Sequence, residues 1–255
     1  MTKKPFSWLL ISGLFFSLLS GSPVKAAAGD VLTVAAASSF SFALTEIAKD
    51  FSRSGQADVR LVFGSSGVLA RQIERGAPFD VFVSANSGFM DELVRSNSVE
   101  ADSVRAFARG RIVIAMLTSS GAEVASLAAL SESSVKKMAI ANPLHAPYGR
   151  AAVEAVKSAG VWEKVREKLV YGENVRQALQ FVESGNVDAG IIALSVARRD
   201  GLRVVPIDPS FHGPILQSAA VVAAAKDLKA AEEFIRYLTG PEGRPVLEKY
   251  GFFVP

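Results

Sequence analysis

Residues 31–51 have the sequence VLTVAAASSFSFALTEIAKDF, an apolar run that ends in two serines and passes directly into a helical pattern. The first seven residues predict a buried strand, because all but Thr33 are apolar. Apolar residues then recur along one helical face, at Phe40, Ala43, Leu44, Ile47, Ala48 and Phe51. A strand that turns into a helix in this way is typical of α/β proteins.

The same alternation continues along the chain and predicts an α/β protein of mainly parallel sheets. Further strands are expected at 59–63, 80–84, 111–117, 138–141, 190–194 and 202–207. Helices are expected at 68–75 and 175–182. A helix pair bent at Ala159–Gly160 is expected over 150–169, and two helices broken at Gly240–Pro241 over 226–250. Ligands of such sheets bind where strands end and helices begin, so those turns are the place to seek function.

The N-terminus predicts a cleaved secretory signal over residues 1–28. Lys3 and Lys4 precede an apolar stretch from Phe6 to Leu19, and small residues at 24–28 offer cleavage sites. The stretch is short for a membrane-spanning helix, which needs about 20 residues. The protein is therefore expected in the periplasm.

Composition excludes several classes of protein. The chain has 255 residues, of which 49% are hydrophobic and 21% are charged, so it suits a large packed core. It has no cysteine, which excludes a lipoprotein anchor and thiolate chemistry. Loss of the three signal lysines leaves 25 basic and 25 acidic residues, so no basic footprint for nucleic acid remains.

Two serine-rich turns carry the strongest chemical signal. Residues 37–40 (ASSF) and 64–67 (GSSG) each follow an expected strand and begin an expected helix. Helix starts carry unpaired N–H groups and a partial positive charge, so two of them together predict an anion site without lysine or arginine. The alternative is that these serines only cap their helices.

Signatures of enzymes are weak by comparison. His145 and His212 lie far apart and lack metal-ligand spacing. Ser133–Lys136 matches S-x-x-K without the companion motifs of that enzyme class. Arg71, Glu74 and Asp80 are interpreted as a local ion-pair set. Trp162 and the pair Phe252–Phe253 are expected in the core.

Five segments, in order, resemble the periplasmic molybdate-binding proteins of ABC importers. The most specific is LARQIERGAPFDVFVSA at 69–85, and AAASS is weak alone. Together they span the chain beyond the signal. They are VLTVAAASSFSFALTEIAKDF (31–51), FGSSGVLARQIERGAPFDVFVSAN (63–86), AIANPLHAPYGRAAVEAV (139–156), ENVRQALQFVESGNVDAGIIAL (173–194) and GPEGRPVLEKYGFFVP (240–255).

The resemblance implies a type II periplasmic binding protein with two α/β lobes and an anion held between them. Lobe one would comprise 30–110 and 222–255, and lobe two 111–221. Neutral donors would hold the anion: the hydroxyls of Ser39 and Ser66 from lobe one, and backbone amides of Tyr148 and Val175 from lobe two. No cofactor, no cation ligands and no catalytic residues are implied.

One position departs from the family pattern. Many members have a tyrosine at Ala193, and its hydroxyl reaches the oxyanion; alanine has no such donor. Members with alanine and leucine in this strand tend to have tyrosine in the APYG loop, as here at Tyr148. Tyr148 is therefore expected to supply both an amide and a hydroxyl.

The resemblance thus predicts a solute-binding protein that captures molybdate or tungstate and delivers it to the membrane permease of an ABC importer. The two anions are nearly equal in size and charge, so the sequence does not rank them. A monomer is expected.

The alternatives are binding of sulfate or phosphate in the same fold, and, more remotely, a secreted serine hydrolase using Ser39 or Ser66, for which no paired base is evident. Ferric binding would require clustered tyrosines, and the four tyrosines are widely spaced.

Overall fold

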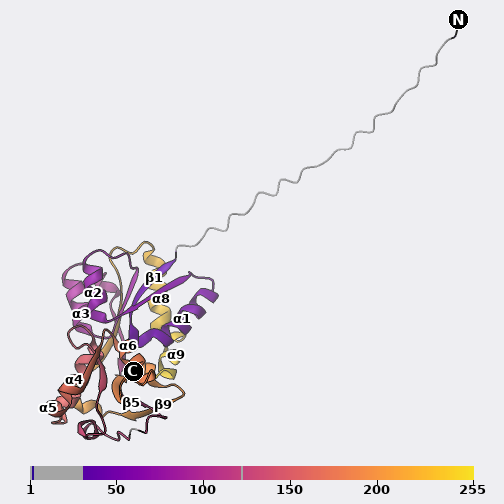
Figure 1. Cartoon of the computed structure of the whole chain (residues 1–255). Helices are drawn as coiled ribbons and strands as arrows, with labels where there is room; N and C mark the ends of the chain where they lie inside the picture. Colours follow the sequence, from indigo (N-terminus) through magenta and orange to yellow (C-terminus); the bar gives the residue numbers. More distant parts are fainter. Residues whose placement is uncertain (1, 3–30, 122) are drawn as a thin grey trace.

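The computed structural model describes residues 2, 31–121 and 123–255, so the predicted signal lies almost wholly outside the described residues. Two five-stranded sheets form two lobes, each flanked by helices. Figure 1 shows α1, α2, α3 and α8 around β1 in one lobe, and α4, α5, β5 and β9 in the other. The predicted two-lobed α/β fold is confirmed. Within these residues no helix is both long and apolar enough to cross a bilayer.

The first sheet has the strand order β2-β1-β3-β10-β4. Only β10 runs against its neighbours, so four of the five strands share one direction. Its strands are β1 Leu32–Ala37, β2 Val59–Gly64, β3 Val81–Ser84, β4 Arg105–Gly110 and β10 Ile215–Val221, and its helices are α1 Ser41–Arg53, α2 Ser66–Glu74, α3 Ser87–Arg95, α8 Leu228–Thr239 and α9 Gly243–Lys249.

The second sheet repeats this plan with the order β7-β6-β8-β5-β9, in which only β5 runs against its neighbours. The predicted mainly parallel sheets are thus confirmed in both lobes. The strands are β5 Ile112–Leu117, β6 Met138–Ala141, β7 Leu169–Gly172, β8 Ala189–Ala193 and β9 Leu202–Pro206, and the helices are α4 Pro147–Ser158, α5 Trp162–Val165, α6 Val175–Glu183 and α7 Leu194–Ala197.

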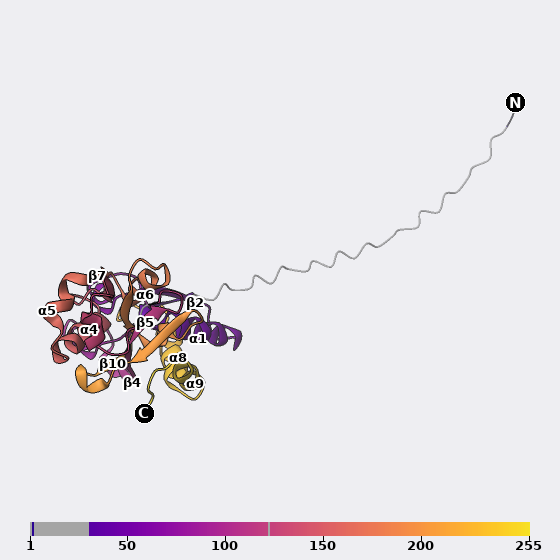
Figure 2. The ribbon, with the colours of Figure 1, turned by 60° about the horizontal axis from the view of Figure 1, so that its bottom comes forward.

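The chain crosses between the lobes twice. The first crossing is Arg111 alone, between β4 and β5, and the second is the segment 207–214 between β9 and β10. The expected boundary at 221/222 misplaces β10, which is hydrogen-bonded to β3 and β4 of the first sheet and lies beside β4 in Figure 2. We therefore propose a division by sheets, with residues 31–110 and 215–255 in lobe one and 111–214 in lobe two.

Most predicted elements are present, and the misses have physical causes. β4 and β7 lie at sheet edges, where exposed side chains break the apolar run, and β10 contains the buried polar pair Gln217 and Ser218. The helix pair predicted over 150–169 is present as α4, which starts earlier, at Pro147, and α5. Gly160, with φ +71°, separates the two helices at the predicted bend, and the chain enters β7 at Leu169.

The core of lobe one joins the two ends of the chain. Phe40 stacks on Phe252 with ring centroids 4.5 Å apart, and Phe51 meets Phe234 edge to face at 5.2 Å. Phe252 is therefore core, as predicted, whereas Phe253 is 49% exposed because its backbone pairs with Arg109 at the sheet edge. Each aromatic pair adds about 0.5–1.5 kcal/mol of stability beyond the contribution of its buried area. Phe234 of α8 and Phe252 near the C-terminus therefore help to fix the position of α1.

Asp80 is a buried link rather than a member of an ion-pair set. Its carboxylate accepts hydrogen bonds from the backbone N–H of Thr33 at 2.7 Å and of Lys226 at 2.9 Å. Among the described residues, Arg71 forms no ion pair with Asp80 or with Glu74. The interpretation as an ion-pair set is wrong because Asp80 directly precedes β3, where backbone N–H groups of two other segments reach its carboxylate.

We predict that Asp80→Ala lowers the free energy of unfolding by about 3 kcal/mol or more, since two hydrogen bonds to a charged acceptor are lost. Asp80→Asn, which keeps one acceptor oxygen, should cost roughly half of that. Urea titration of the variants measures both values. Equal stability of Asp80→Ala and the unaltered protein would contradict this role.

Candidate anion-binding site

Four chain segments meet at a small cavity between the lobes. Lobe one contributes 37–39 and 64–66 together with Ala85, and lobe two contributes 146–148 and 174–175. The cavity therefore brings together the four residues singled out from the sequence: Ser39, Ser66, Tyr148 and Val175. Every residue that lines it is uncharged.

Each segment is a helix start placed there by the strand before it. β1 leads into the single 3₁₀ turn Ser38–Phe40 and then α1, and β2 leads into α2. In lobe two, Pro147 occupies the first turn of α4, a position that suits proline because its missing N–H has no helical partner. Asn174 caps α6 by accepting from the N–H groups of Arg176 and Gln177. Helix starts from both lobes therefore face one space.

The backbone donors at these starts are unpaired. Within the described part of the chain, the N–H groups of Ser39, Ser66, Tyr148 and Val175 form no hydrogen bond outside their own helices, and N–H groups in the first turn of a helix have no partner within it. An unpaired buried N–H is costly, and helix starts carry about half a positive charge each. The arrangement therefore favours a bound anion that accepts several hydrogen bonds at once.

The serine hydroxyls do not cap their helices, which counts against capping as their sole role. No side-chain cap is formed at the 3₁₀ turn, α1 or α2. Ser66 Oγ accepts from Ala85 N at 3.0 Å, so its own proton stays free to donate. Ser39 Oγ is buried and pairs with no group of the described residues.

The lobes touch each other around the cavity. Ser65 Oγ lies 2.7 Å from His145 Nδ1, and Gly67 N–H donates to the His145 carbonyl at 3.0 Å. Ser195 Oγ, from α7, donates to the carbonyl of Ser39 at 2.8 Å. These bonds hold the lobes in a closed arrangement. They also occupy the Ser39 carbonyl, so this acceptor does not compete for the cavity's donors.

Stacked cations support the closed arrangement farther out. Phe42 of α1 lies under the guanidinium groups of Arg176 and Arg199 from lobe two, each 4.8 Å from its ring centroid. Arg150 of α4 covers Phe89 of α3 at 5.1 Å. Such contacts contribute about 0.5–2 kcal/mol each. The arginines nearest the cavity thus face aromatic rings rather than line the site.

Two titratable groups beside the cavity are held neutral. Burial, together with the positive charge of Arg71, lowers the pKa of His145, and Glu173 opposes the shift. Burial raises the pKa of the Tyr148 phenol far above its ordinary value, and the nearby polar groups of Ser39, Ser195 and Gln217 only partly oppose this. None of the three completes a hydrogen bond to the phenol, so it is a buried neutral donor without a partner among the described residues.

Comparison with known proteins decides the family. The model of the family described as bacterial extracellular solute-binding proteins matches residues 32–253. The chain belongs to the bacterial extracellular solute-binding proteins. This solute-binding protein is 34% identical to the molybdate-binding protein ModA of Azotobacter vinelandii over 95% of its own length and 97% of that protein's. It is 31% identical to ModA of Escherichia coli, over 97% and 98% of the two chains.

Solved structures agree with this assignment. The periplasmic molybdate-binding protein of Azotobacter vinelandii superposes with a TM-score of 0.81 at 27% identity, covering 88% of this solute-binding protein and 99% of that chain. The sulfate-binding protein SubI of Mycobacterium tuberculosis superposes with a TM-score of 0.76 at 19% identity, covering 87% and 86%. The second match shows a shared fold only.

The structural roles of several residues of the site are not predicted by the sequence. Ser65, His145 and Ser195 connect the lobes, and Asn174 shapes a helix start. Asn174 had a visible signal, because asparagine directly before a helix is a favoured cap. The contacts of Ser65 with His145 and of Ser195 with Ser39 join positions 80 and 156 residues apart, so no local pattern indicates them.

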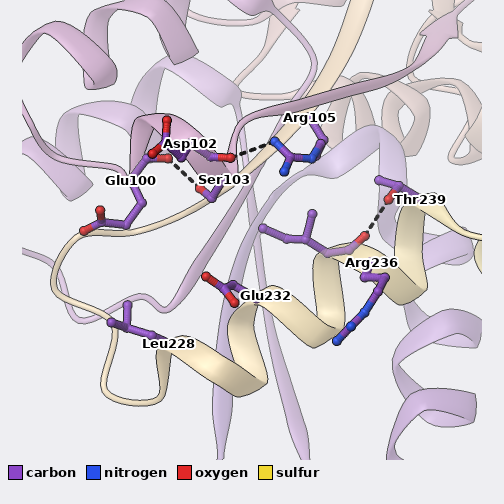
Figure 3. Close-up of a pocket in the computed structure, with 9 residues that line it drawn as sticks. Glu100, Asp102, Ser103, Arg105, Leu228, Glu232, Arg236 and Thr239 are labelled. Carbon is purple, nitrogen blue, oxygen red and sulfur yellow. Dashed lines mark hydrogen bonds between the residues drawn. The ribbon is translucent and has the colours of Figure 1, made fainter.

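A larger hollow on the solute-binding protein lies elsewhere. It is formed in lobe one between α8 and the chain before β4. Figure 3 shows its charged lining, with Arg105 donating to the Asp102 carbonyl and Glu232 and Arg236 on α8. Acidic and basic side chains there face solvent together, and no helix starts from two lobes converge. It lacks the features that make the inter-lobe cavity an anion site.

The two serines should differ in what they contribute to the ligand-free solute-binding protein. Ser66→Ala leaves the buried Ala85 N–H unpaired and should lower the free energy of unfolding by about 1–3 kcal/mol. Ser39→Ala removes a hydroxyl without a protein partner and should change stability by less than about 0.5 kcal/mol. Thermal or urea unfolding without ligand distinguishes them. Equal losses would mean that Ser39 is a structural residue too.

Proposed function

We propose that this protein binds a tetrahedral oxyanion dianion, molybdate or tungstate, between its lobes and delivers it to the permease of an ABC importer. The observation that carries the proposal is the convergence of unpaired N–H and hydroxyl donors on a cavity with no charged lining. The names of the full-length relatives support the same ligand class. As a binding protein it needs no cofactor.

Neutral donors suit a dianion for an energetic reason. Hydrogen bonds to a charged acceptor contribute about 1.5–3 kcal/mol each, so several convergent donors offset the loss of the anion's hydration. Ser39, Ser66, Tyr148 and Val175 offer four backbone N–H groups, and the serine hydroxyls add two more donors. This set would hold the anion without any lysine or arginine, as expected from the sequence.

The donor set also supports discrimination among anions. Phosphate at neutral pH carries a proton that needs an acceptor, and the backbone N–H groups that converge on the cavity can only donate. Sulfate carries no proton and differs mainly in its smaller size. The cavity radius, set by contacts such as Ser65 with His145, would separate sulfate from molybdate. Sulfate binding remains the alternative that the experiment below must exclude.

The hydrolase alternative fares worse, although one serine does have a paired base. Ser65, rather than Ser39 or Ser66, lies within hydrogen-bond distance of a histidine. Its side chain is only 3% exposed, and the bond joins the two lobes. A nucleophile must reach its substrate, so we assign this pair to lobe closure. The family assignment favours solute binding over catalysis.

The setting of the protein follows from the same assignment. We propose that the signal at 1–28 is removed on export and that the mature chain works in the periplasm as a monomer. Its partner would be the membrane permease, and the described residues include no helix suited to the membrane itself. Tungstate should bind alongside molybdate because the two anions share charge and shape.

The decisive measurement is titration calorimetry of the mature protein with molybdate, tungstate, sulfate and phosphate. Molybdate and tungstate should bind and should raise the melting temperature by mass action, and the other two should not at equal concentration. Binding of sulfate alone would overturn the ligand assignment. Ser39→Ala serves as the matched variant: it should weaken molybdate binding by roughly 1.5–3 kcal/mol while the ligand-free fold stays intact.

The molybdate affinity of a Tyr148→Phe variant tests the contribution of lobe two to the site. Ala193 offers no donor, and the Tyr148 phenol is a buried donor without a partner, so Tyr148→Phe should weaken molybdate binding by about 1.5–3 kcal/mol. The variant keeps the ring and the backbone N–H. Unchanged affinity, with an ordered water beside the anion in a liganded crystal structure, would show that water replaces the phenol.

A further inference from the structure

Gly110 is the last residue of β4 and directly precedes the first crossing between the lobes. A Cβ atom at this position would collide with the Tyr148 hydroxyl, would lie 2.9 Å from Tyr148 Cζ and would lie 3.0 Å from Gln217 Nε2. Gly110 is not among the glycines with positive φ, so its backbone does not itself require glycine. The missing side chain matters because the tyrosine occupies that space.

Tyr148 links this position to the anion cavity. It lines the cavity, its backbone belongs to the first turn of α4 in lobe two, and its hydroxyl end also lies against Gly110 in lobe one. The whole side chain is only 3% exposed. One residue therefore contacts the anion cavity, lobe two and the strand that leads into the crossing.

Gln217 forms the other wall of the same space. It lies in β10, on the return strand, where the pairing with β4 shifts register between Gln217 and Ser218. The side chain is fully buried, and Nε2 donates to the Ile215 carbonyl at 2.7 Å, which fixes the amide beside the ring. Both strands that join the lobes thus line the space that holds the Tyr148 phenol. This space, bounded by Gly110 and Gln217, is called the phenol seat below.

We infer that Gly110 and Gln217 are positioning residues. By holding the Tyr148 phenol in the phenol seat when the lobes close, they keep the N–H donor of Tyr148 at the anion cavity and so couple lobe closure to anion binding. The ring comes from one lobe and the seat from the other, so the two fit only in the closed arrangement. Filling the seat would push Tyr148, and with it the N–H donor of α4, away from the cavity. The inference rests on the proposed oxyanion function for its binding consequence, but the seat itself is testable without ligand.

Gly110→Ala fills the seat with a single methyl group. It should weaken molybdate binding by about tenfold or more, because a rigid packed position cannot absorb such an overlap. Gly213→Ala is the matched control on the second crossing, where a Cβ atom would meet only Glu154 Oε2 at an ordinary 3.5 Å. It should bind within about twofold of the unaltered protein, since surface substitutions of this kind have small effects.

A second variant shows that the effect passes through the ring. Tyr148→Leu removes both the hydroxyl and Cζ, whereas Tyr148→Phe would leave Cζ in the way. Gly110→Ala should lower the ligand-free melting temperature by several degrees with Tyr148 present and by much less in the Tyr148→Leu background, as expected for two residues in contact. Molybdate affinity should show the same non-additivity.

The outcomes separate the two proposals. If the unaltered protein binds no oxyanion, the proposed function fails. The melting temperatures of the two single variants and the double variant, measured without ligand, still decide whether the phenol seat exists. If it binds molybdate and Gly110→Ala binds equally well, the coupling is wrong and the function stands. Additive melting losses in Gly110→Ala and Tyr148→Leu would likewise overturn the seat, and circular dichroism confirms that each variant is folded.

Discussion

The structure depends on one constraint: backbone N–H groups at helix starts must find partners, and here those of Ser39, Ser66, Tyr148 and Val175 find none in the described chain. The parallel strands of each sheet end on the same side, which places these helix starts along one seam. The protein therefore bears a local energetic cost in the cavity that a suitable anion would remove. Packing elsewhere, such as Phe40 on Phe252, holds the helix starts in place.

Closure and binding are linked because the same residues serve both. The Ser39 hydroxyl lies at the cavity, and its carbonyl accepts a hydrogen bond from Ser195 of lobe two. The Ser66 hydroxyl accepts from Ala85 N–H, and the neighbouring Ser65 contacts His145 of lobe two. The donors of lobe one are thus fixed partly by lobe two. A site divided in this way is complete only when the lobes meet, so affinity depends on the free energy of closure as well as on the contacts themselves.

Sequence reasoning predicted the parts of the molecule that are encoded locally. The apolar face of α1, from Ala43 to Phe51, and the two serine turns follow from residue spacing. β10 was missed because its centre carries the buried polar residues Gln217 and Ser218, which interrupt the apolar run that marks a buried strand. Asp80 was misassigned for a related reason: its partners, Thr33 and Lys226, are 47 and 146 residues away along the chain. The resemblance to a family named four cavity residues, whereas the contacts between lobes required coordinates.

The arginines stacked on aromatic rings have a kinetic consequence. Arg150, Arg176 and Arg199 lie where lobe two meets lobe one, and their guanidinium groups stack on Phe89 and Phe42 instead of lining the cavity. Their charge reaches an approaching anion through solvent, where dissolved salt screens it over about 10 Å at 0.1 M. Once inside, the anion meets only neutral donors. Raising the ionic strength should therefore lower the association rate of the anion while leaving its residence time in the cavity almost unchanged.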